Sequence, residues 1–236
     1  MPRDPRIWLG GGFIVLLLVA AIFAPLLSPF DPLEQDLLLA TAGPGVEPGH
    51  VLGTDSLGRD VLSRLIHACR IALTVAFVAA TLACLLGTML GLLAGYFGGI
   101  ADLVISRLVD IWMAFPPVLL SILLVAVLGT GLHSVIIAIV VIDWTRFARV
   151  VRAETQQQAK LEYAEAATAL GMGRGAILFR EILPNVLPVV LVLLSLEMGI
   201  AVIVEAILSF VGLSVSTDTP TWGGMIAEGR QIIYQA

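Results

Sequence analysis

Residues 71–97 contain no charged residue. About 20 mostly apolar residues are enough for a helix to cross the hydrocarbon core of a bilayer. A helix suits that environment because it satisfies its backbone N–H and C=O groups internally. Charged residues make up 13% of the whole sequence, against about 25% in a soluble domain. The sequence therefore predicts an all-α membrane protein.

The apolar pattern predicts a polytopic helical bundle with five visible spans. These are residues 8–27, 71–97, 102–128, 132–151 and 184–213. A cleaved signal peptide is the alternative for the first span, but its apolar run is long for such a segment. Phe115-Pro116-Pro117 should kink or break the third span, because proline lacks a backbone donor. The fourth span is the least apolar, since Asp143 and Arg146 interrupt it.

Small residues and polar segments add detail to this plan. Gly87, Gly91 and Gly95 recur every four residues, which predicts a helix face that allows close backbone approach. Residues 28–50 are rich in Pro, Gly and acids and should be irregular. A short helix is expected to follow, capped by Asp55 or Ser56, with an ion pair between Asp60 and Arg64.

The basic residues predict the orientation. With a cytoplasmic N-terminus, inside segments hold most of them, as the positive-inside tendency requires. The inside set is Arg3, Arg6, Arg107, Arg146, Arg149, Arg152, Lys160, Arg174 and Arg180, and the outside set is Arg59, Arg64, Arg70 and Arg230. The expected regions are 1–27 (cytoplasmic N-terminus and first span), 28–69 (extracytoplasmic, with the short helix), 70–213 (transmembrane core, with cytoplasmic loop 153–183) and 214–236 (extracytoplasmic).

The cytoplasmic loop contains an alanine-rich stretch, residues 160–171, that predicts a short helix ending at Gly171. Its small residues would allow close docking into a groove of a partner, and Glu162 and Glu165 would present acid on one side. Local physics leaves open whether this is a docking helix or an ordinary connector between two spans.

The motif Glu165-Ala166-Ala167, followed by Gly171 and then Leu183-Pro184, resembles the EAA loop of permease subunits in binding-protein-dependent ABC importers. The family pattern places Ile where this sequence has Glu181. The resemblance implies that Glu162, Glu165, Ala166, Ala167, Gly171, Leu183 and Pro184 couple the chain to an ATPase.

Further motifs resemble the C-type inner-membrane subunit of dipeptide, oligopeptide and nickel importers, in family order along nearly the whole chain. They include Leu52-Gly53-Thr54-Asp55, Gly58-Arg59-Asp60, Ser63-Arg64, residues 91–99, Arg107-Leu108-Val109-Asp110, residues 148–152, residues 205–213, Trp222-Gly223 and Glu228-Gly229-Arg230. The resemblance implies the type I ABC importer permease fold and a location in the bacterial inner (plasma) membrane as a multi-pass protein. It also implies a sixth span, expected beyond residue 236.

The implied function is that of a non-catalytic permease that forms half of a pathway for di- or oligopeptides. The sequence has no phosphate-binding loop and one lysine, Lys160, so no cofactor is expected on this chain. ATP and Mg would be bound by two cytoplasmic ATPase subunits. The other implied partners are a homologous B-type permease, an extracytoplasmic substrate-binding protein and membrane lipid. No basic run favours nucleic acid, and no ligand pattern favours a metal.

Three acidic residues lie within predicted spans: Asp143, Glu197 and Glu205. Such residues usually face protein or water, so they are candidates for the translocation path. Asp143 or Glu197 could favour a cationic end such as a peptide amino terminus, whereas Glu205 fits a packing role better. Nickel or another small solute is the alternative cargo, and an ion-coupled secondary transporter that uses these acids is the alternative mechanism.

Overall fold

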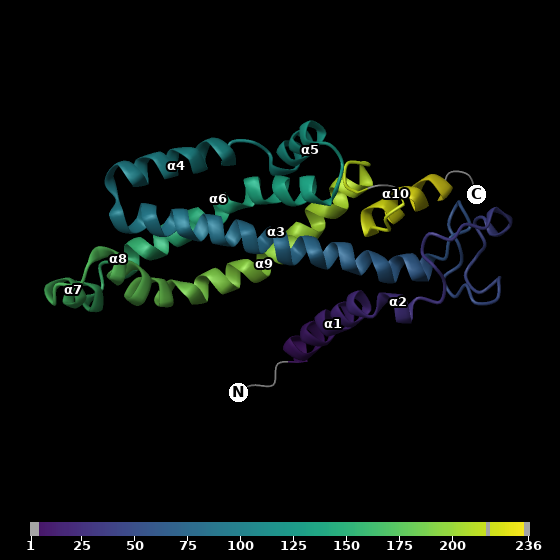
Figure 1. Cartoon of the computed structure of the whole chain (residues 1–236), viewed down its shortest axis with the longest axis horizontal. Coiled ribbons are helices and arrows are strands. Elements are labelled where there is room, and N and C mark those ends of the chain that lie inside the picture. Colours follow the sequence, from purple (N-terminus) through teal and green to yellow (C-terminus); the bar gives the residue numbers. More distant parts are fainter. Residues whose placement is uncertain (1–4, 216–217, 234–236) are drawn as a thin grey trace. The chain divides into compact units, whose positions relative to one another are not determined.

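The computed structural model describes residues 5–215 and 218–233, which are mainly helical (Figure 1). The helices in chain order are α1 (Pro5–Ile22), α2 (Ala24–Leu27), α3 (Val61–Phe97), α4 (Gly99–Met113), α5 (Pro117–Leu128), α6 (Leu132–Gln158), α7 (Glu162–Ala169), α8 (Arg174–Ala176), α9 (Leu183–Phe210) and α10 (Trp222–Ile233). A 3₁₀ turn covers Leu37–Leu39, and a π-helical segment, Ile177–Ile182, joins α8 to α9.

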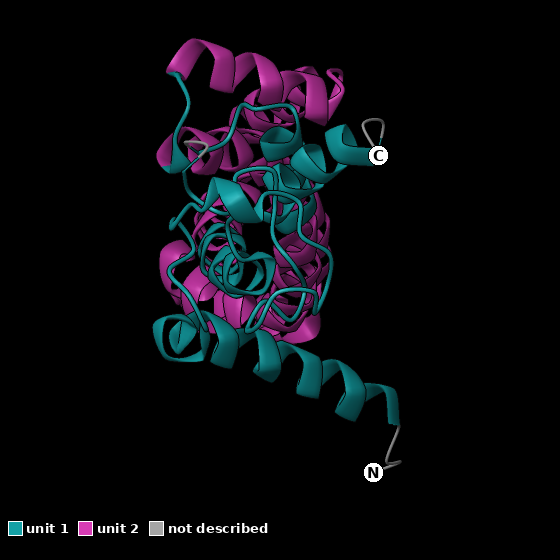
Figure 2. Cartoon of the chain, turned by 90° about the vertical axis from the view of Figure 1, so that its right-hand side faces the viewer, with its two compact units in different colours: residues 1–75, 129–132, 202–236 teal, residues 76–128, 133–201 magenta. Residues whose placement is uncertain are grey.

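The chain divides into two compact units, each coloured separately in Figure 2. Unit 1 comprises residues 1–75, 129–132 and 202–236, and unit 2 comprises residues 76–128 and 133–201. Helices α3 and α9 contribute residues to both units.

Unit 1 contains α1, α2, the irregular segment up to residue 60 and α10. The first span is shorter than predicted, because α1 ends at Ile22 and Pro25 lies in the first turn of α2. A proline ring clashes with the carbonyl four residues earlier, so one straight helix cannot continue through this point.

The prediction of a separate short helix after residue 53 is wrong. Residues 53–60 form turns, and the helix that follows is the start of α3, which continues unbroken to Phe97. Its N-cap is Asp60 rather than Asp55 or Ser56, since an Asp60 carboxylate oxygen accepts from the Ser63 backbone N–H at 2.7 Å. The predicted pair of Asp60 with Arg64 is also wrong: Asp60 pairs with His50 at 2.9 Å, and Arg64 pairs with Asp55.

Unit 2 confirms the glycine face of α3. A Cβ atom added at Gly91 would lie 2.8 Å from the Ala148 carbonyl oxygen, and one at Gly95 would lie 2.7 Å from the Arg152 carbonyl oxygen. The backbones of α3 and α6 therefore touch along this face. Glycine is required there because any side chain would push the two helices apart.

The double proline ends one helix and starts the next, as predicted. Helix α4 stops at Met113, α5 begins at Pro117, and the two are bent by 90°. Helix α6 runs on to Gln158, beyond the predicted end of the fourth span.

Length and apolar composition qualify three helical stretches in the described residues as membrane spans, or four if the bent pair α4 and α5 is one span. The three are Pro5–Ile22, Val61–Phe97 and Arg174–Phe210. Many large apolar side chains of these helices are exposed, as expected where lipid or another membrane subunit is the neighbour. Helix α6 is long enough to cross but too polar to qualify, so the fourth span, residues 132–151, remains a prediction.

Candidate functional site

The predicted coupling segment folds as a helix, a tight turn and a second helix in unit 2. Helix α7 ends at Ala169, and Gly171 follows with φ of +78°, a conformation that glycine adopts without steric cost. The chain then passes through α8 and the π-helical segment into α9, where Leu183 and Pro184 form the first turn. Figure 1 shows α7 beside α8.

The two sides of α7 face different surroundings. Ala164 and Ala167 are buried, and Ala167 joins a core cluster that includes Ile177, Leu178 and Ile182 of the π-helical segment. The small-residue side of α7 therefore packs on its own chain. Glu162, Glu165 and Ala166 are exposed, so the acidic side is the one left open to a partner.

Two of the acidic residues in the predicted spans share one arginine. Arg146 of α6 donates to both carboxylate oxygens of Glu197 in α9, at 3.0 and 3.1 Å. Arg146 also lies 3.9 Å from an oxygen of Asp143, which precedes it by three residues in the same helix. Both acidic residues are buried, whereas the Arg146 side chain is 31% exposed, so one partly exposed guanidinium neutralises two buried carboxylates.

Glu205 occupies a separate position in unit 1. Its side chain is buried near the end of α9 and accepts a hydrogen bond from the Ser214 hydroxyl at 3.0 Å. The Ser214 carbonyl in turn accepts from the Gly131 N–H at 2.8 Å. Glu205 thus ties the end of α9 to the segment that follows it.

Two ion pairs between α4 and α6 were not foreseen. Arg152 donates to both carboxylate oxygens of Asp102, and Arg149 donates to Asp110 at 2.9 Å. The second pair is more than half exposed and contributes little stability. The sequence separation of these partners gave no signal that they meet.

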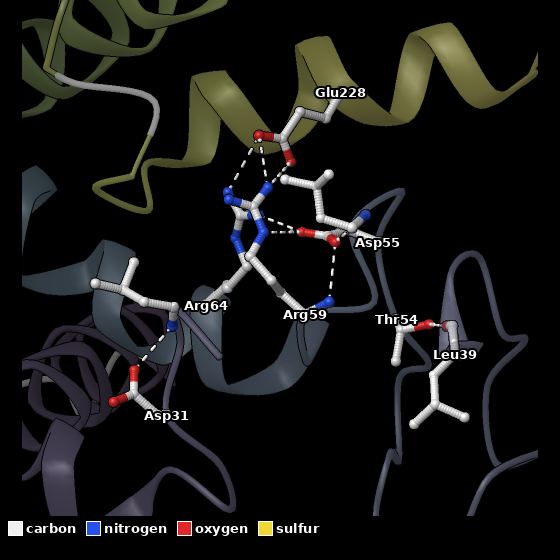
Figure 3. Close-up of polar contacts among 9 residues, drawn as sticks. Asp31, Leu39, Thr54, Asp55, Arg59, Arg64 and Glu228 are labelled. Atoms are coloured by element: carbon white, nitrogen blue, oxygen red, sulfur yellow. Dashed lines mark hydrogen bonds and ion pairs between the residues drawn. The ribbon is translucent and has the colours of Figure 1, made fainter. Parts of the chain in front are cut away.

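A buried charge cluster in unit 1 was also missed, although its members lie in motifs noted above. Arg59 and Arg64 each pair with both Asp55 and Glu228 of α10, as Figure 3 shows. Burial alone would raise the pKa of Asp55. Hydrogen bonds from the backbone N–H groups of Arg59 and Leu57 and from the Arg59 guanidinium, together with the Arg64 charge, outweigh burial and place the Asp55 pKa below its ordinary value.

His50 lies beside this cluster and is buried. Its Nδ1 atom lies 2.9 Å from Asp60, and its ring stacks on Phe30 with centroids 4.3 Å apart. The same segment therefore has its own small packed core.

The comparisons with known proteins agree with this architecture. The family model described as "Binding-protein-dependent transport system inner membrane component" matches residues 87–235. A second model, the "N-terminal TM domain of oligopeptide transport permease C", matches residues 3–44.

Similar curated proteins include three bacterial permeases. The dipeptide transport system permease protein of Alkalihalophilus pseudofirmus is 40% identical over 95% of this chain and 74% of its own length. The glutathione transport system permease protein of Pectobacterium atrosepticum is 39% identical over 93% of this chain and 73% of its own. The di/tripeptide transport system permease protein of Pseudomonas aeruginosa is 39% identical over 97% and 77%.

A solved structure has the same fold. A chain of the MetNI methionine ABC transporter in inward-facing conformations matches with a TM-score of 0.60. The match covers 73% of this chain and 83% of that chain at 22% identity, which supports the fold alone. Together with the family matches, it shows a polytopic helical membrane protein. The chain belongs to the family of inner membrane components of binding-protein-dependent transport systems.

Proposed function

We propose that this chain is the permease subunit of an ATP-driven importer of di- or oligopeptides. The observation that carries the substrate class is the named function of its relatives: permeases for dipeptides, di/tripeptides and glutathione match at 39–40% identity. Glutathione is itself a modified tripeptide. The substrates of these relatives are therefore all short peptides, which supports a pathway for short peptides in this chain.

Uptake by the complete importer in proteoliposomes tests this proposal. We expect labelled dipeptide to accumulate only with internal ATP and added binding protein, and to be unaffected by dissipating the proton and sodium gradients. Accumulation of nickel instead of peptide would identify nickel as the transported solute. Uptake that follows an ion gradient without ATP would support the secondary transporter.

The acidic side of α7 is proposed to seat in a groove of a cytoplasmic ATPase. Glu162, Glu165 and Ala166 would make the contact, while Ala167 and the turn at Gly171 hold α7 against its own chain. Leu183 and Pro184 begin α9, so they would pass movement of α7 into a membrane helix.

Neutralising the acidic side tests the coupling role. The double variant Glu162→Gln/Glu165→Gln should lower ATPase association and peptide uptake while the permease still accumulates in the membrane. Glu154→Gln is the matched control, because the new side chain keeps the oxygen that accepts from Gln158. Equal ATPase recovery on purifying all three proteins would contradict this role.

The orientation is proposed from the basic residues. The N-terminus and loop 153–183 would be cytoplasmic, and residues 28–69 and 214–236 extracytoplasmic. An impermeant thiol reagent applied to intact cells should label a cysteine at position 34 and spare one at position 165. The reverse pattern would invert the assignment.

The partners and cofactors follow from the family. An ATPase and a substrate-binding protein are general to binding-protein-dependent importers. We propose two ATPase subunits that bind ATP and Mg, and a B-type permease that completes the pathway. Purification of the importer with mass spectrometry of its components checks this composition.

Asp143, Glu197 and Glu205 remain candidates for the translocation path. Glu197 and Glu205 already have hydrogen-bond partners in their own chain, whereas the Arg146 guanidinium lies 3.9 Å from Asp143. Asp143 is therefore the best candidate to meet a peptide ammonium group. Unchanged uptake by both Asp143→Asn and Glu197→Gln would exclude this role for the pair.

A further inference from the structure

Asp55 organises two arginines in the extracytoplasmic part of unit 1. One of its oxygens accepts from the backbone N–H groups of Leu57 and Arg59, at 2.8 and 3.0 Å. The other accepts from Arg59 Nε at 2.7 Å and from Arg64 Nη1. Both arginines are almost fully buried, with 3% and 2% exposure. The segment 55–64 thus forms a preorganised receptor that presents two guanidinium groups.

This receptor has one positive charge in excess until Glu228 of α10 completes it. Arg59 Nη2 lies 3.2 and 3.3 Å from the two Glu228 oxygens, and Arg64 Nη2 lies 3.2 Å from one of them (Figure 3). A buried charge without a partner is strongly unfavourable. The receptor therefore favours a carboxylate at this position.

Glu228 is the least buried member of the cluster. Its side chain is 29% exposed, whereas those of Asp55, Arg59 and Arg64 are 3–9% exposed. The three receptor residues belong to one short stretch of chain, and Glu228 comes from another helix. If the cluster opens, Glu228 is the member that leaves.

Helix α10 is fixed more tightly at its start than at Glu228. A Cβ atom added at Gly223 would lie 2.8 Å from the Ala206 carbonyl carbon, so α10 and α9 are in backbone contact there. Trp222 Nε1 also donates to the Leu65 carbonyl at 3.4 Å. Glu228 lies five residues beyond Gly223, about 7.5 Å along the helix. The start of α10 can act as a pivot and Glu228 as a second, releasable contact.

A cavity of about 170 Å³ lies between α10 and the receptor, lined on the α10 side by Met225, Glu228, Gly229 and Ile232. Close packing is therefore incomplete under the part of α10 that Glu228 holds. Movement here would disturb few contacts besides the ion pairs.

We propose that Glu228 is a positioning residue whose bridge to Arg59 and Arg64 holds α10 in one position and is released during the transport cycle. This proposal rests on the proposed importer function and adds a control point on the extracytoplasmic side. In the resting importer the bridge keeps α10 against the receptor. Release leaves the arginine receptor with an uncompensated positive charge, which favours the return of α10 when the cycle ends. In this proposal the closed bridge also suppresses ATP hydrolysis that is not coupled to transport.

The test compares Glu228→Gln, which removes the charge, with Glu228→Asp, which retains a carboxylate on a shorter side chain. Glu34→Gln is the matched control, because Glu34 is exposed and has no ion pair among the described residues. A Met225→Cys probe reports opening of the cavity through its labelling rate with an impermeant maleimide. The native thiols Cys69 and Cys84 are buried, which keeps their background reaction low.

In the complete importer, Glu228→Gln should raise the labelling rate at position 225 by about fivefold or more, the effect of losing one charge partner. It should also raise ATP hydrolysis without binding protein and lower the peptide imported per ATP. Glu228→Asp should restore most of both properties. Glu34→Gln should match the wild type.

Unchanged labelling and unchanged peptide per ATP in Glu228→Gln would overturn the proposal. An equal loss of ATPase activity and uptake with unchanged labelling would indicate that Glu228 has only a structural role, and this result would also overturn the proposal. If Glu228→Gln does not accumulate, labelling at position 225 that is fivefold or more faster in Glu228→Asp than in the wild type decides against the proposal, because the retained carboxylate should still hold α10. A wild-type importer that carries no peptide, with faster labelling in Glu228→Gln, would refute the peptide proposal and leave this one standing.

Discussion

Replacing Gly91 by valine should force α3 and α6 apart. The first added carbon alone would lie 2.8 Å from both the Ala148 carbonyl oxygen and Val151 Cβ, where ordinary contact is 3.4–4 Å. The obstacle includes backbone, so a rotamer change cannot relieve it, and the helices must separate by roughly 1 Å, enough to lose a quarter to a half of each dispersion contact. Overpacking of this kind costs about 3 kcal/mol, and the better helix propensity of valine offsets only about 0.5 kcal/mol.

The expected net loss of about 2–3 kcal/mol corresponds to a melting temperature lowered by roughly 5–10 °C, if the scaling for soluble domains of this length applies. Thermal unfolding of the purified importer in detergent, followed by tryptophan fluorescence, measures it. Gly199→Val is the control, because Gly199 also lies within a helix but a Cβ there meets nothing within 4 Å. If both variants melt at the same temperature, the close approach of α3 and α6 is refuted.

Three further predictions concern charges and a turn. Arg146→Met should lower the free energy of unfolding by about 3 kcal/mol, because it leaves two buried carboxylates without their cation. Glu197→Gln should lower it by only roughly 1–2 kcal/mol. Equal losses in denaturant titrations would contradict the shared-arginine arrangement. Gly171→Ala should lower the free energy of unfolding by about 1–2 kcal/mol, because Gly171 has a positive φ, whereas Gly175→Ala, with ordinary φ, should not. Equal melting temperatures of the two variants would count against the turn at Gly171. The Asp55 pKa is depressed in the folded chain, so its stabilising effect is complete above the ordinary value of 3.8 and is lost as the pH falls through the lower folded value. The difference in melting temperature between wild type and Asp55→Asn should therefore shrink below pH 3.8, and a constant difference would refute this.

Local patterns predicted the elements that depend on short-range physics. The apolar runs gave α3 and α9, the double proline gave the break before α5, and the alanine-rich stretch gave α7 with its turn at Gly171. The errors were also local in origin. The first span is shorter than predicted because a proline lies inside its apolar run. Assigning the helix cap to Asp55 predicted a separate short helix where α3 begins and continues unbroken.

The charged residues show the limit of sequence reasoning. Asp60 and Arg64 have favourable helical spacing, yet Arg64 pairs with Asp55 and Glu228, the latter 164 residues away. Spacing along a helix says which side chains could meet, whereas burial decides which charges must be compensated.

The sequence by itself determined that the chain is a helical membrane protein and where the short helix α7 lies, because hydrophobic length and helix propensity act over a few turns. The tertiary structure decided which side of that helix stays open. Ala164 and Ala167 pack against their own chain, and the acidic side is left exposed, because the apolar π-helical segment folds back onto the small residues. It also decided that Glu228 completes the arginine receptor, since a distant carboxylate is found only when the helices are in place.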